Sequence, residues 1–307
     1  MRNLLLDSSV ALRFSGHETF PLRLLWLKKA YDAVVDGVTA KRTFQEQEAV
    51  ARFGVGKNMA MSMLYWAIAC GVVDEKDGQL EVTALGHLLL NNKSGLDPYL
   101  EDASTVWLVH NALSATPNVT TFFFAFNLFS QPLFERSALV QDIAEIATAR
   151  GARATAETVK RDVEVLLRSY APRSADTGED ASEPLLAELG LIRELRGGQF
   201  ELVRGPKPSL SQAVFAYALV LYWQRWHKDS PTISVETIAY GVGAPGSVFR
   251  LDEESLAFRL AAIGDVTGGA LVWTDTAGLR QVARRESLHS IDVLKLLEQA
   301  YPARLVA

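Results

Sequence analysis

The sequence has very little cysteine: Cys70 is the single cysteine among 307 residues. A lone thiol cannot form a disulfide framework or a thiolate metal cluster within the chain. Apolar runs are also short, and none approaches the roughly 18 residues that a membrane-spanning helix needs. Residues 1–13 lack the basic start, long apolar core and small-residue cleavage site of a signal peptide. We therefore expect a soluble, cytoplasmic protein that has no membrane partner.

An excess of positive charge is missing as well. The 31 lysines and arginines are outnumbered by 36 acidic residues, which gives a formal net charge of −5. Nucleic-acid affinity comes largely from basic side chains that displace counterions at phosphates. A function on nucleic acid therefore requires local basic patches here, or positive charge supplied by partner proteins. The composition is otherwise that of a globular protein, and the length fits two or three domains.

The first hundred residues carry a recognisable order of elements. Apolar side chains at helical spacing predict a helix over residues 20–36, with Pro21 in its first turn. Two more helices are predicted, over 45–53 and 57–70, on either side of a glycine turn. Two short strands around Asp77-Gly78 follow, and then a short helix over 84–90. Helix, turn, helix and hairpin is the order of a winged helix-turn-helix.

A similar pattern recurs twice further along, without a strict sequence repeat. The second occurrence comprises helices over 155–170 and 185–189, a polar loop over 174–182, and strands over 191–195 and 199–203. Helices predicted over 105–115, 122–129 and 138–149 form a connector between the first two occurrences. The third comprises helices over 210–226, 235–240 and 253–263, and strands over 270–274 and 279–283.

We therefore predict a mainly α protein with small β-hairpin wings, built from tandem winged helix-turn-helix units. The predicted domains are an N-terminal unit over 1–95, a helical connector with a second winged-helix-like unit over 96–205, and a C-terminal α+β unit over 206–307.

Residues 14–20 have the sequence FSGHETF, which places an imidazole and a carboxylate side by side before the first predicted helix. Free amides and the positive dipole end at a helix start attract anions such as phosphate. His17 as a proton carrier, Glu18 as a metal ligand or base, and Arg23 as a phosphate contact would suit phosphodiester hydrolysis. The same residues also fit a structural role, in which a hydroxyl of the segment caps the helix. No acidic cluster lies at a diagnostic spacing nearby.

Three residues of the predicted helix 57–70 are candidates for DNA contact. Lys57 and Asn58 open this helix, and Tyr65 points away from its apolar side, as in a recognition helix that meets a groove. The alternative is that the unit contacts another protein and that Lys57 is a solvated charge.

The predicted helix 155–170 carries a second candidate surface, because Arg161 and Arg168 share one face. As a stripe they would suit phosphate groups. Glu157 and Glu164, however, lie four residues before the two arginines, a spacing that forms surface ion pairs. A self-neutralised surface is the favoured interpretation of this helix, and the stripe remains the alternative.

Two segments, FSGHETF over residues 14–20 and GVGKNM over residues 54–59, resemble a bacterial protein family found in DNA phosphorothioation gene clusters. The resemblance covers roughly residues 14–300. Further matching stretches are Tyr99-Leu100-Glu101-Asp102, Trp107-Leu108-Val109-His110, Lys160-Arg161-Asp162-Val163 and residues 184–192. The chain is similar to the SspB-type component of single-strand phosphorothioation (Ssp) systems, a family whose function was long unknown.

This resemblance implies a DNA-nicking endonuclease that opens one strand of double-stranded DNA for sulfur insertion in antiphage defence. The implied partners are a cysteine desulfurase, an ATP-pyrophosphatase-like sulfur transferase and an ATPase. It makes His17 and Glu18 the best candidates for catalysis, with Arg23 as a phosphate contact. A divalent metal, Mg²⁺ or Mn²⁺, is expected if the nicking activity is present, and its ligands are unknown from the sequence.

Two other functions fit the same residues. The first is a non-catalytic target-recognition subunit of the same system, which would bind specific DNA without cutting it. The second is a transcriptional regulator, in which paired winged helices bind an operator as a homodimer. Nicking by the isolated protein would separate the enzyme from both.

Overall fold

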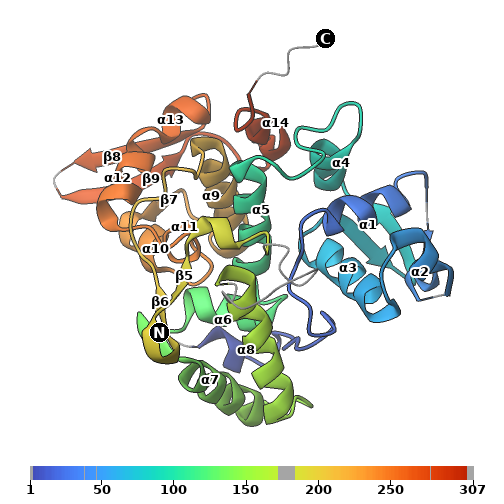
Figure 1. Cartoon of the computed structure of the whole chain (residues 1–307). Helices are drawn as coiled ribbons and strands as arrows, with labels where there is room; N and C mark the ends of the chain where they lie inside the picture. The colour runs from blue at the N-terminus through green and yellow to red at the C-terminus, as the bar shows by residue number, and fades with distance from the viewer. Residues whose placement is uncertain (1–2, 38, 46, 172–183, 277, 303–307) are drawn as a thin grey trace. The chain divides into compact units, whose positions relative to one another are not determined.

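A helix, a short strand, a group of helices and a two-stranded hairpin follow one another three times along the chain (Figure 1). The computed structural model describes residues 3–37, 39–45, 47–171, 184–276 and 278–302. The chain forms two compact units, Met1–Glu101 with Thr116–Val203 and Asp102–Ala115 with Arg204–Ala307. The first unit holds two copies of this order of elements, and the second unit holds the third copy.

The first copy confirms the elements that were predicted with turn and cap signals. Gly71, with φ +71°, ends α3, and Thr83 accepts a hydrogen bond from the Gly86 amide to cap α4. Asp77 and Gly78 form the hairpin turn with positive φ at both residues. The elements are α1 (Trp26–Val34), β1 (Thr39–Ala40), α2 (Gln47–Phe53), α3 (Lys57–Ala69), β2 (Val73–Lys76), β3 (Gln79–Val82) and α4 (Ala84–Leu90).

The second copy follows the same plan within the first unit. Thr155 caps the long amphipathic helix α8 by accepting a hydrogen bond from the Thr158 amide at 3.2 Å. The polar loop predicted over residues 174–182 lies outside the described residues. The elements are α6 (Thr120–Asn127), β4 (Leu133–Glu135), α7 (Arg136–Ala149), α8 (Ala156–Tyr170), β5 (Ile192–Glu194) and β6 (Gln199–Leu202).

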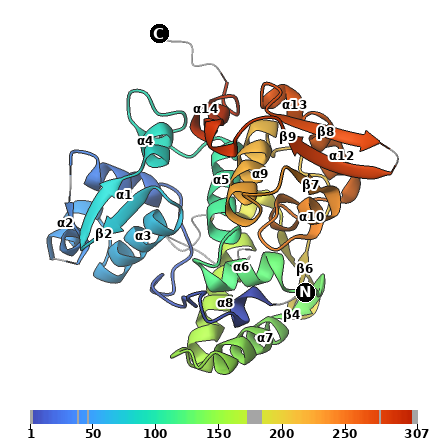
Figure 2. The same cartoon turned by 180° about the vertical axis from the view of Figure 1, so that it is seen from behind.

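The second unit contains the third copy together with α5 (Ala103–Ser114) and α14 (Val293–Glu298). Its hairpin, β8 (Leu271–Thr276) with β9 (Leu279–Arg284), has six residues in each strand and is the longest of the three (Figure 2). The remaining elements are α9 (Gln212–Trp226), β7 (Thr232–Ser234), α10 (Val235–Tyr240), α11 (Pro245–Val248), α12 (Glu253–Ala261) and α13 (Ile263–Val266).

Each copy builds a three-stranded antiparallel sheet with the same topology. The strand orders are β1-β3-β2, β4-β6-β5 and β7-β9-β8, so the strand before the helices pairs with the last strand of the hairpin. The hairpins were predicted, whereas β1, β4 and β7 were not. These strands have only two or three residues, which is too short for an alternating pattern to be visible. The expectation of a mainly helical protein with small sheets is confirmed.

The predicted start of the first helix was wrong. The helix begins at Trp26 rather than at residue 20, and the preceding Leu25 has the left-handed φ of +65°. The Phe20 carbonyl, which would start the longer helix, instead accepts a hydrogen bond from Trp66 Nε1 on α3 at 3.1 Å. A tertiary contact thus overrides the local helical pattern. Among the described residues, no helix is both long and apolar enough to cross a membrane.

Candidate functional site

Residues 14–20, which we call the FSGHETF loop, form a tight turn with an unusual backbone. The Phe20 amide donates a hydrogen bond to the His17 carbonyl at 2.8 Å, and the two residues between them, Glu18 and Thr19, have φ of +47° and +66°. Non-glycine residues in the left-handed region cost about 1–3 kcal/mol each, and β-branched residues are rarest there. Such a turn persists only where its surroundings hold it in place.

Both ring nitrogens of His17 take part in holding the turn. Nδ1 accepts a hydrogen bond from the Thr19 amide at 3.2 Å, so the neutral ring carries its proton on Nε2. Nε2 donates that proton to Asp162 Oδ1 at 3.0 Å, and the imidazole is buried. His17 therefore fixes the position of its neighbour Glu18 rather than presenting a free nitrogen.

Asp162 on α8 is the residue that holds the loop from the other side. Its carboxylate also accepts hydrogen bonds from the Ser15 amide at 3.0 and 3.1 Å and from Thr121 Oγ1 at 3.5 Å, and it is buried. Asp162 lies in the matching stretch over residues 160–163, but no role was predicted for it, whereas the neighbouring Arg161 was a candidate for DNA contact. The available signal was an aspartate at helical spacing from Val159, on the buried side of α8, where a carboxylate requires partners.

Helix α3 packs against the FSGHETF loop. Ser62 Oγ donates to the His17 carbonyl at 2.9 Å, and the His17 ring stacks on Trp66 with the ring centroids 5.9 Å apart. Gly16, with φ +89°, lies against the Tyr65 ring so closely that a Cβ would be 2.8 Å from two ring carbons. Glycine at this position is therefore required both by the backbone conformation and by the space available.

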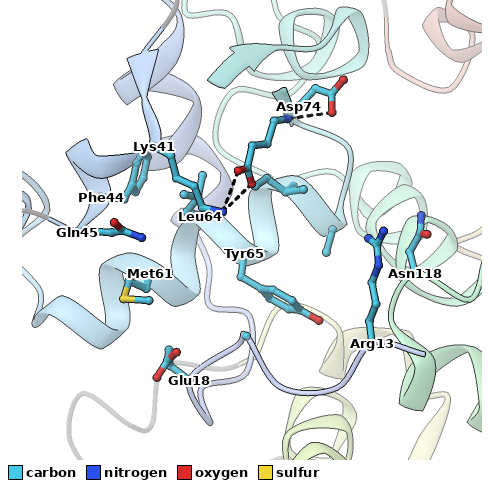
Figure 3. Close-up of a pocket in the computed structure, with 14 residues that line it drawn as sticks. Arg13, Glu18, Lys41, Phe44, Gln45, Met61, Leu64, Tyr65, Asp74 and Asn118 are labelled. Atoms are coloured by element: carbon cyan, nitrogen blue, oxygen red, sulfur yellow. Dashed lines mark hydrogen bonds and ion pairs between the residues drawn. The ribbon is translucent and has the colours of Figure 1, made fainter. Parts of the chain in front are cut away.

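A pocket of about 560 Å³ opens between the FSGHETF loop and α3 (Figure 3). Glu18 is half-buried at its edge, and Tyr65 is half-buried in its middle. Arg13 and Asn118 lie at one end, opposite Phe44 and Gln45. Of the residues predicted from the sequence, Glu18 and Tyr65 thus meet at one site. Arg13, Gln45 and Asn118 lie outside the sequence motifs and were not predicted as site residues.

The charges around the pocket are of both signs. Lys41 Nζ binds both oxygens of the Glu75 carboxylate at 2.9 and 2.8 Å, which neutralises this part of the rim. Burial, together with the nearby Asp162 carboxylate, raises the pKa of Tyr65. Tyr65 is consequently a neutral phenol at physiological pH.

Arg23, the predicted phosphate contact, lies beside aromatic rings. Its guanidinium carbon is 5.9 Å from the Phe20 ring centroid and 5.5 Å from that of Trp26, which are cation–π distances. The backbone of Arg23 also forms an isolated antiparallel bridge with Pro184. Arg23 follows the FSGHETF loop but is not part of the pocket lining.

Lys57 and Asn58 occupy the first two positions of α3 and are exposed, as predicted. Their helix also contributes the floor of the pocket through Met61, Leu64 and Tyr65. The exposed N-terminal end of α3 and the pocket therefore belong to the same helix.

Lys160 and Arg161, two basic residues of α8, form ion pairs with one carboxylate. Arg161 Nε lies 3.4 Å from Glu157, as the spacing predicted, and Lys160 lies 3.9 Å from the same carboxylate. Glu164 pairs with Arg136 on α7. Arg168 is half-buried. The contacts agree with the interpretation of a largely self-neutralised surface.

A divalent metal was expected together with nicking. Within the described part of the chain, no group of three or more histidine, cysteine, aspartate or glutamate side chains is placed to hold a metal ion.

The fold and the loop define a mainly helical protein in which a buried histidine–aspartate pair fixes a glutamate at the edge of a pocket. The profile of the family described as protein of unknown function (DUF4007) matches residues 14–301, and the chain belongs to this family. A magnesium-ion-bound crystal structure of SspB has the same fold, with a TM-score of 0.86 and 26% identity over 97% of this chain and 90% of that chain.

A second SspB crystal structure is equally similar, with a TM-score of 0.86, 27% identity and the same coverage. The resemblance to the SspB-type family is thereby confirmed. A comparison with curated protein sequences finds no significant match.

Proposed function

We propose that this protein is the SspB-type, DNA-nicking component of a bacterial phosphorothioation defence system, and that it opens one strand for sulfur insertion. The observation that carries the proposal is the FSGHETF loop, whose strained turn is fixed at both ends and presents Glu18 at a pocket beside α3. Strain of this kind persists where a site must be held in one geometry. The similarity to SspB supports the assignment to this system.

We also propose that the three copies are winged helix-turn-helix units. In each copy the strand before the helices pairs with the last strand of the hairpin, so that helices and sheet form one module. The second helix of such a module meets a DNA groove and the hairpin meets the backbone. In the first copy this helix is α3, where Lys57 and Asn58 are exposed and would contact double-stranded DNA.

The roles at the site follow from the contacts. Glu18 is the candidate base that accepts a proton from the water attacking the phosphodiester. His17 is a positioning residue, because its two nitrogens hold the turn and Asp162. Arg23 remains the proposed phosphate contact, and Arg13, which lines the pocket, is a second cation for the same purpose.

The partners of the proposal are those of the phosphorothioation system, namely a cysteine desulfurase, an ATP-pyrophosphatase-like sulfur transferase and an ATPase in the cytoplasm. The net charge of −5 is unfavourable for DNA binding by the whole surface of this protein. A partner that adds positive charge would strengthen the complex on DNA.

Conversion of supercoiled plasmid to the open circle tests the proposal. The purified protein is incubated with plasmid in EDTA, in Mg²⁺ and in Mn²⁺, and the products are separated on an agarose gel. We expect open circles to accumulate before linear DNA. Failure to nick in all three conditions, and also with the partner proteins present, would contradict the enzyme function.

A non-catalytic recognition subunit is the second candidate, and two observations favour it. Both nitrogens of His17 are engaged, and the described residues hold no metal-binding cluster. Sequence-specific binding in a gel-shift assay, without cleavage of the bound DNA, would establish this function instead.

A further inference from the structure

We propose that the pocket between the FSGHETF loop and α3 binds a single unpaired nucleobase of the DNA strand. The inference rests on the proposed function in one respect, namely that the protein acts on DNA. It adds the part of the substrate that this pocket takes and the residues that recognise it.

The shape and lining of the pocket suit a flat ring. Its volume of about 560 Å³ lies within the range of about 300–1,000 Å³ typical of small-molecule sites. Its floor is apolar and is built by one face of α3, with Met61, Leu64, Tyr65 and Ile68. Phe44 borders the floor at one end (Figure 3) but is itself buried against Phe53, so Tyr65 is the aromatic residue that a base would contact. Bases that leave the helical stack are held in this way, between aromatic and apolar side chains.

Tyr65 is a rigid platform in this floor. Gly16 lies against its ring, and the rings of His17 and Trp66 contact it edge-on with centroid distances of 5.8 and 5.1 Å. The raised pKa of Tyr65 keeps the phenol neutral, which suits stacking and hydrogen bonding and disfavours a phenolate nucleophile. A ring that is already fixed loses little conformational entropy when a base stacks on it.

The charges of the rim favour a neutral base over a phosphate. Glu18, Asp74 and Glu75 are acidic, whereas Arg13 and Lys41 are basic, and Lys41 is paired with Glu75. A phosphate inside the pocket would meet a net negative rim. A nucleobase carries no charge, and its edge offers donors and acceptors.

The exposed side chains of Gln45 and Asn118 lie at opposite ends of the pocket, so each offers an amide to a different edge of a base that stacks on Tyr65. Arg13 lies at the same end of the pocket as Asn118 (Figure 3). Its guanidinium is placed to bind the phosphate that flanks the inserted nucleotide.

A base enters such a pocket only when it is not paired. Extrusion from a duplex costs a few kcal/mol, and this cost is smallest where the base is already unpaired. The protein should therefore prefer a duplex with one extra, unpaired base to the same duplex in which that nucleotide is abasic. The difference isolates the contribution of the base, because the backbone and its charges are the same.

The test measures the affinity of the full-length protein for these two duplexes by fluorescence anisotropy. We expect the unpaired base to bind about five- to 150-fold more tightly than the abasic site, which is the usual value of one base stacked on an aromatic residue. Tyr65→Ala should remove most of the difference and Tyr65→Phe should keep it. Met61→Trp, which fills a half-exposed part of the pocket, should also remove it if Tyr65→Ala does not fold.

Tyr99→Ala is the matched control, because this tyrosine is 57% exposed, lies in the same unit and does not line the pocket. It should leave the difference unchanged. Equal affinity of the wild type for the two duplexes, with DNA binding and nicking intact, would overturn the base pocket and leave the proposed function standing. Absence of binding to either duplex and to plasmid, alone and with the partner proteins, would overturn both.

Discussion

At the scale of single residues, the position of the FSGHETF loop depends on the pair formed by His17 and Asp162. The two residues are 145 positions apart in the chain, and their side chains meet at 3.0 Å in a buried environment. The imidazole also has a structural function through Nδ1, so the pair stabilises the loop and the packing of α8 at once. Its loss should therefore affect stability as well as activity.

We expect Asp162→Ala to lower the free energy of unfolding by about 3 kcal/mol or more, because it leaves the His17 ring and the Ser15 amide without their acceptor. Urea denaturation measures the change. Glu157→Ala, an exposed carboxylate on the same helix, is the control and should cost less than about 1 kcal/mol. Equal, small effects of both substitutions would show that the buried pair does not hold the loop.

His110 in the second unit should make the protein sensitive to acid. Burial lowers the pKa of His110 from 6.5 to about 4, while Nε2 donates to the Val248 carbonyl at 2.7 Å. Between pH 6.5 and about pH 4, the His110 side chain is protonated in the unfolded chain and neutral in the folded chain. The stabilising contribution of the neutral, buried His110 is therefore complete above pH 6.5 and is lost as the pH falls toward 4.

From pH 7 to pH 5 this residue should lower the free energy of unfolding by about 2 kcal/mol. Urea denaturation of wild type and His110→Gln at both pH values isolates the effect, because other titrating groups are common to the two proteins. An identical pH dependence of the two proteins would contradict the assignment.

At the scale of elements, the FSGHETF loop requires glycine at one position. We expect Gly16→Ala to destabilise the protein by about 2–4 kcal/mol, since a Cβ meets the Tyr65 ring at 2.8 Å and φ is +89°. Gly54→Ala is a matched control with φ +67° and no atom within 4 Å of its Cβ, so it carries the backbone cost alone. Thermal or urea unfolding measures the destabilisation of both variants. Equal destabilisation would show that the close contact with Tyr65 is unimportant.

Helix α3 should bind DNA through its exposed first turn. Lys57→Glu should weaken DNA binding and reduce the slope of log affinity against log salt concentration by about 1, because one phosphate contact is lost. Lys93→Glu, at an exposed lysine after α4, makes the same charge change and should leave that slope unchanged. If both variants behave like wild type while remaining folded, α3 does not lie at the DNA.

The elements with strong local signals could be predicted from the sequence. The period of α3, its glycine cap and the Asp77-Gly78 turn are all local, and each was found as predicted. The start of α1 could not be predicted, because the contact between Trp66 and the Phe20 carbonyl decides it. The site was predicted only in part for the same reason. Glu18 lies in a motif, whereas Asp162 and Asn118 reach the loop and pocket through tertiary structure.

At the scale of the whole molecule, the recurring order of elements and the acidic charge must be reconciled. As the proposed winged helix-turn-helix units, the three copies would offer several helices to DNA, while a net charge of −5 opposes non-specific binding. Recognition would then rest on a few local cations and on base contacts rather than on a general positive surface.

Glu18 of the FSGHETF loop is the proposed general base of DNA nicking, and the nicking rate of its glutamine variant tests this role. The rate of plasmid nicking by Glu18→Gln is compared with that of wild type, after urea denaturation has shown that both proteins are equally stable. We expect the nicking rate to decrease by about 100-fold or more, as for the loss of a general base, with DNA affinity little changed. An unchanged nicking rate in the folded variant would contradict this role and would move the catalytic site away from this loop.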